Sequence, residues 1–122
     1  MTQKQIAIVN TNKNTPSALK SLLSDLGYGV ECYTQVSTLI EFTKTRPTDV
    51  IIIESDIESD TGLNLVKTFN QLVNPIPTIL LTDNGDLQSA VEALKFGALN
   101  YIEKPIADSA LAKIVHQACL HI

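Results

Sequence analysis

The sequence predicts a single α/β domain built on a parallel β-sheet. Short apolar runs alternate with helical patterns from one end of the chain to the other, as in successive βαβ units. The length of 122 residues suits one hydrophobic core. The run 50-VIII-53 is continuously apolar, which is typical of a central parallel strand that is covered on both faces.

The first three strands and two helices follow from this alternation. The first expected strand, residues 5–9, leads into a polar loop and then Thr15-Pro16, where a threonine cap precedes proline at the first helical position. Leucines recur at helical spacing as far as Leu26, and a Gly-Tyr-Gly run ends this helix. The next elements are a strand at 30–34, a helix with Val36, Leu39 and Ile40 facing inward, and a strand at 50–53.

The second half of the chain repeats the pattern. A helix from about Leu63 to Asn70 precedes a strand at 78–81. Asp86 is expected to cap the following helix, whose apolar positions at helical spacing are Leu87, Val91 and Leu94. A fifth strand at 100–103 is followed by a last helix that carries Leu111, Ile114 and Val115, with Asp108 or Ser109 as its expected cap.

Polar residues gather where the predicted strands end. In an open parallel sheet, the functional crevice lies outside the carboxyl ends of the strands. Four segments reach that edge: Asn10 to Asn12, Glu54 to Asp60, Thr82 to Asp86, and Lys104-Pro105. We therefore expect the functional site at this edge of the sheet.

Over essentially its whole length, the chain resembles the receiver domain of response regulators, the CheY-like module of two-component (phosphorelay) signalling. The resemblance is carried by the order and spacing of 47-PTDVIIIE-54, Gly62 and 78-TILLTDNGDLQSAVEALKFGALNYIEKP-105. It implies a flavodoxin-like (CheY-like) doubly wound sheet of five parallel strands in the order 2-1-3-4-5, with five helices. Residues 1–122 would form one receiver domain, which leaves open that the chain is the N-terminal part of a longer regulator.

The resemblance also implies roles for individual residues. In this family, two acids after the first strand bind Mg²⁺, and an aspartate at the end of the third strand accepts a phosphoryl group from a sensor histidine kinase. A threonine and a lysine then bind the phosphoryl oxygens, and an aromatic residue of the fifth strand changes rotamer with them. The matching positions hold Asn10 and Thr11 for the acid pair, Glu54 for the acceptor, and Thr82, Lys104 and Tyr101 for the threonine, lysine and aromatic residue.

These departures predict a degenerate receiver, or pseudo-receiver, that works without phosphorylation and is not an enzyme. Asn10 and Thr11 are neutral, and each unit charge lost at about 4 Å changes an ionic interaction by ~4 kcal/mol, so Mg²⁺ binding is expected to be weak or absent. Glu54 adds one methylene, and misplacing a reacting group by about 1 Å costs on the order of 100-fold in rate. We expect Glu54 to pair instead with Lys104, and with Thr82 as a second candidate partner, in one permanent state. No cofactor or resident metal is expected.

Alternative interpretations remain open at this stage. Glu54 and Lys104 can form a salt bridge that is structural only. The chain can be a phosphotransfer-competent receiver that accepts phosphate at Asp56 or at Glu54 with Mg²⁺. It can also be a module that senses a small anion or a nucleotide beside Thr82 and Lys104.

Charge and hydropathy limit the classes of partner. The net charge is −4, with 13 acidic and 9 basic residues, so direct nucleic-acid contact is not expected. The chain has neither an export signal nor a membrane-length apolar run, so we expect a cytoplasmic protein. Expected partners are an output domain or a partner protein, which includes a second copy of the chain in a homodimer. A sensor histidine kinase is a further candidate. In relatives the contact face is the fourth helix, fifth strand and fifth helix, which here includes Leu87, Lys95, Tyr101 and Glu103. Transcription regulation is the expected setting.

Overall fold

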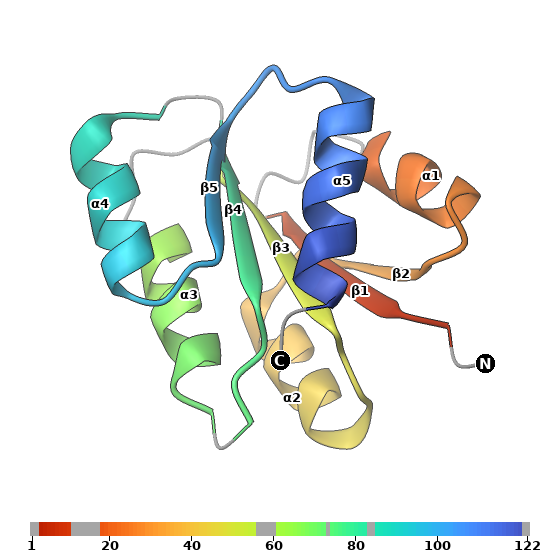
Figure 1. Ribbon diagram of the computed structural model, residues 1–122. Coiled ribbons are helices and arrows are strands. Elements are labelled where there is room, and N and C mark those ends of the chain that lie inside the picture. Colours follow the sequence, from red (N-terminus) through yellow and green to blue (C-terminus); the bar gives the residue numbers. More distant parts are fainter. Residues whose placement is uncertain (1–2, 11–17, 56–60, 73, 83–84, 121–122) are drawn as a thin grey trace.

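The computed structural model describes residues 3–10, 18–55, 61–72, 74–82 and 85–120. Five parallel strands form one sheet in the order β2-β1-β3-β4-β5, which confirms the predicted flavodoxin-like topology (Figure 1). The strands are β1 (Gln5–Asn10), β2 (Gly29–Tyr33), β3 (Val50–Ser55), β4 (Thr78–Thr82) and β5 (Asn100–Glu103). The helices are α1 (Ala18–Asp25), α2 (Val36–Thr45), α3 (Thr61–Asn70), α4 (Leu87–Lys95) and α5 (Asp108–Cys119). Within the described ranges, no helix has the length and apolar character needed to cross a membrane.

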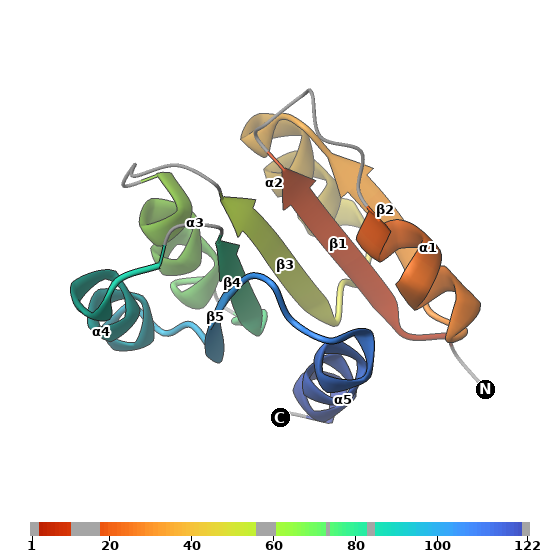
Figure 2. The same cartoon turned by 90° about the horizontal axis from the view of Figure 1, so that it is seen from above.

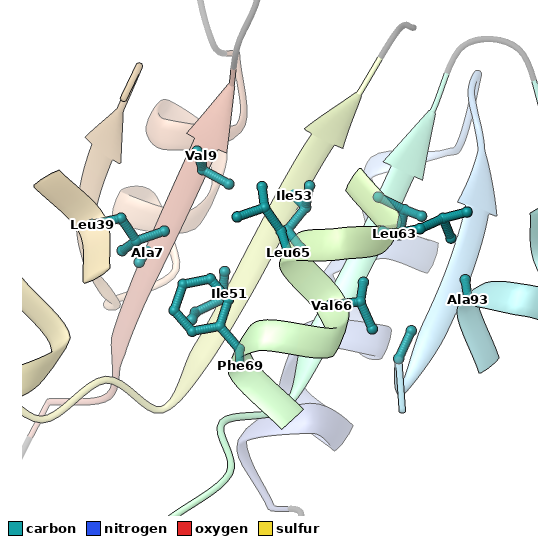
Figure 3. Packing of buried hydrophobic residues seen from close by; sticks show 12 residues of the cluster. Ala7, Val9, Leu39, Ile51, Ile53, Leu63, Leu65, Val66, Phe69 and Ala93 are labelled. Carbon is teal, nitrogen blue, oxygen red and sulfur yellow. The ribbon is translucent and has the colours of Figure 1, made fainter. Parts of the chain in front are cut away.

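The helices form a layer on each face of the sheet. Figure 2 shows α1 and α5 on one face, with α2 and α3 on the other. Successive residues of β3 alternate between the two layers. Ile51 and Ile53 belong to the cluster under α2, α3 and α4 (Figure 3). Val50 and Ile52 belong to the cluster under α1 and α5. All four side chains are buried, which explains why this strand is continuously apolar.

The helix ends test the predicted caps. Asp86 is the N-cap of α4, and its Oδ1 accepts a hydrogen bond of 2.7 Å from the backbone N–H of Ser89, as predicted. The predicted cap of α5 is wrong, because Ala107 occupies the N-cap without a side-chain hydrogen bond. Asp108 lies instead in the first turn, where its negative charge favours the positive end of the helix dipole. Thr15 and Pro16 lie outside the described residues.

Helix α4 presents an apolar stripe to solvent. Leu87, Val91 and Leu94 are 81%, 47% and 54% exposed, although these are the apolar positions whose spacing predicted a helix here. The helix packs on the domain through small side chains instead, since Ala93 is fully buried and Ala90 is half-buried. A spacing of four and three residues places the three exposed side chains on one face of the helix. We call this set the α4 stripe.

Candidate functional site

The carboxyl ends of the central strands bring the predicted site residues to one edge of the sheet. The register pairs Asn10 of β1 with Glu54 of β3, and Thr82 of β4 with Glu103 of β5. The backbone N–H of Lys104 donates to the carbonyl of Thr82 at 2.8 Å, so Lys104 directly follows the paired part of β5. Figure 2 shows β1 and β3 ending side by side at this edge. Thr11 and Asp56 lie outside the described residues.

An ion pair between Glu54 and Lys104 occupies the crevice. Lys104 Nζ lies 3.0 Å from Glu54 Oε2 and donates a hydrogen bond to it. The Glu54 side chain is only 7% exposed, whereas that of Lys104 is 30% exposed. A carboxylate with so little exposure to solvent needs a charged or hydrogen-bonded partner, because burial removes its hydration. The predicted pairing of Glu54 with Lys104 is therefore present in the structure.

Thr82 and Asn10 border this ion pair from the neighbouring strands. Thr82 is 5% exposed at the end of β4, and its strand neighbour on β3 is Ser55, the residue after Glu54. Asn10 is half-buried beside Glu54 on the other side. The Lys104–Pro105 peptide bond is cis. Asn10, Glu54, Thr82 and Lys104 therefore lie near one another at this edge, and their functional roles stay predictions.

Tyr101 lies where β5 meets the loop before α4. Its half-buried side chain packs against the cluster under α2, α3 and α4. Burial raises the pKa of the Tyr101 hydroxyl above its ordinary value, a hydrogen bond with the backbone of Asp86 opposes this rise, and the charges of Asp86 and Glu103 add to it. The hydroxyl therefore remains protonated at neutral pH and is held against the loop that carries Asp86.

Gly85 makes that close approach possible. A Cβ at this position would lie 2.6 Å from Glu103 Oε2 and 3.2 Å from the Tyr101 hydroxyl, so a side chain here would make the exposed Glu103 carboxylate move and would crowd the Tyr101 hydroxyl. The sequence suggested a turn here but gave no sign of this contact with Tyr101. A glycine in a loop signals close packing only when the opposing strand is known.

The described residues do not fit a resident magnesium ion. Mg²⁺ favours carboxylate and water oxygens in near-ideal octahedral geometry. The described side of the crevice offers the neutral amide of Asn10 and one carboxylate, Glu54, which is already bound to Lys104. No group of three or more His, Cys, Asp or Glu side chains suited to a metal ion occurs among the residues whose structure is described. Bringing a divalent cation to Glu54 would also set it against the nearby ammonium group.

Comparison with known proteins gives consistent matches. Residues 6–116 match the family described as "Response regulator receiver domain". The chain is 27% identical over 122 residues to the transcriptional regulatory protein FixJ of Rhizobium meliloti, covering 100% of this chain and 60% of FixJ. It is 26% identical over 113 residues to the response regulator protein TodT of Pseudomonas putida, covering 93% of this chain and 50% of TodT. The chain thus spans between half and three fifths of the length of these two relatives.

Solved structures match the same fold. A crystal structure titled FixJ-N superposes with a TM-score of 0.85 at 26% sequence identity and covers 100% of this chain and 98% of that one. The crystal structure of a response regulator from Thermotoga maritima superposes with a TM-score of 0.86 at 20% identity, covering 98% and 100% of the two chains. This second likeness concerns the fold alone.

Proposed function

The chain belongs to the response-regulator receiver domain family of two-component signalling, and from that premise we propose that it is a degenerate receiver whose output does not depend on phosphorylation. The observation that carries this proposal is the ion pair of 3.0 Å between Glu54 and Lys104. On this proposal the chain has no catalytic activity of its own. It acts by protein–protein contact in one fixed state.

On this proposal the Glu54 carboxylate substitutes for a bound phosphoryl oxygen. Resemblance to the family assigns Lys104 and Thr82 to phosphoryl recognition, and both residues lie at the end of the sheet beside Glu54. An anionic oxygen of Glu54 already accepts a hydrogen bond from the ammonium of Lys104, and the Glu54 side chain is largely closed to water. Glu54 thereby supplies within the chain the negative charge that a phosphoryl group supplies elsewhere in the family.

Phosphorylation is disfavoured by the same arrangement. An in-line attack needs a free, correctly placed oxygen and stabilisation of the charge on the transferred group. Here the Glu54 carboxylate is bound to Lys104, and the neighbouring Asn10 contributes no charge. Moving Glu54 into attack would leave the half-buried Lys104 without that carboxylate.

The α4 stripe gives this fixed state a surface for regulation. Leu87, Val91 and Leu94 expose apolar groups next to β5, which lies at the edge of the sheet and carries Tyr101. Clustered exposed apolar side chains mark contact sites more often than scattered ones do. We place the contact with an output domain, a partner protein or a second copy of the chain on α4, β5 and α5. The names of FixJ and TodT favour transcriptional control by a response regulator as the setting. On this proposal the protein acts in the cytoplasm, and its output does not require a sensor histidine kinase.

Phosphate transfer from a small donor tests the proposal. The protein is incubated with acetyl phosphate and Mg²⁺, and its intact mass is measured over time. The proposal predicts no addition of phosphate, with a functional receiver domain as positive control. Mg²⁺-dependent addition of one phosphate, mapped to Glu54 or Asp56, would instead establish the chain as a phosphotransfer-competent receiver.

A further inference from the structure

We draw no further inference here: the strongest candidate, the apolar surface patch that Leu87, Val91 and Leu94 form on α4, belongs to the contact face already proposed, and nothing in the described parts of the chain shows what covers it.

Discussion

Replacing Glu54 by glutamine should destabilise the domain measurably while keeping its shape. The glutamine amide oxygen can still accept from Lys104 Nζ, so the change removes charge with little loss of volume or hydrogen-bond geometry. At the observed separation of 3.0 Å, two unit charges attract each other by about 5.5 kcal/mol if the effective dielectric is about 20. Desolvation of both groups offsets part of this gross value.

The exposure of the two side chains sets the net magnitude. Breaking a fully buried ion pair costs roughly 3–5 kcal/mol, whereas exposed pairs contribute only about 0.2–1 kcal/mol. Glu54 is nearly buried, but the 30% exposure of Lys104 lets water solvate part of the ammonium left behind. We therefore expect Glu54→Gln to lower the free energy of unfolding by about 1–3 kcal/mol. Urea denaturation followed by circular dichroism measures this difference.

The chain provides a matched control for this experiment. Glu41 and Lys44 of α2 form an ion pair of 3.2 Å whose side chains are 75% and 64% exposed. Glu41→Gln should therefore change the free energy of unfolding by less than about 0.5 kcal/mol. Equal stability changes for Glu54→Gln and Glu41→Gln, or a gain in stability with Glu54→Gln, would refute the reasoning.

Three further predictions concern the chemistry, the surface and the pH response. The triple change Asn10→Asp, Thr11→Asp and Glu54→Asp should restore Mg²⁺-dependent phosphorylation by acetyl phosphate, measured as intact mass. Glu54→Asp alone should not restore it, because the acid pair is still missing. Phosphorylation of this single variant would show that the acid pair is dispensable. Leu87→Gln combined with Leu94→Gln should weaken self-association or partner binding, measured by sedimentation velocity. The free energy of unfolding should change by less than about 1 kcal/mol, because both side chains are exposed. The control Leu26→Gln alters an apolar side chain that is 52% exposed on another surface and should leave association intact. Burial raises the pKa values of Tyr28, Tyr33 and Tyr101 above the ordinary 10.0, so the unfolded chain loses these protons first and the free energy of unfolding should fall as the pH rises above that value. Urea denaturation at a series of pH values from about pH 9 to about pH 11 should show a shallower fall of this free energy for Tyr101→Phe. The same dependence on pH in the variant and the parent protein would contradict this assignment.

The sequence predicted the crevice because strand ends in a parallel sheet are fixed by topology. The apolar run 50-VIII-53 predicted a buried β3, and Glu54, the next residue, lies within the carboxyl end of that strand and is 6% exposed. Lys104 follows β5 in the same sense, so both residues reach one edge. Their ion pair then follows from opposite charge and burial.

Other features depend on neighbours that periodicity does not reveal. The spacing of Leu87, Val91 and Leu94 correctly indicated a helix, but the small residue Ala93 forms its buried contact. Hydrophobic periodicity identifies an apolar face without identifying what covers it. Gly85 was recognised only as part of a turn, because its close approach to Tyr101 depends on the path of the loop.

The response of Glu54 and Lys104 to a phosphoryl analogue tests the central claim most directly. A crystal structure of the protein soaked with magnesium and beryllofluoride would show which anion the ammonium group contacts. The account predicts that Lys104 Nζ stays within hydrogen-bond distance of Glu54 Oε2 and that neither species is bound at this edge of the sheet. Ordered magnesium and beryllofluoride on Glu54, with Lys104 turned toward the fluorides, would contradict it.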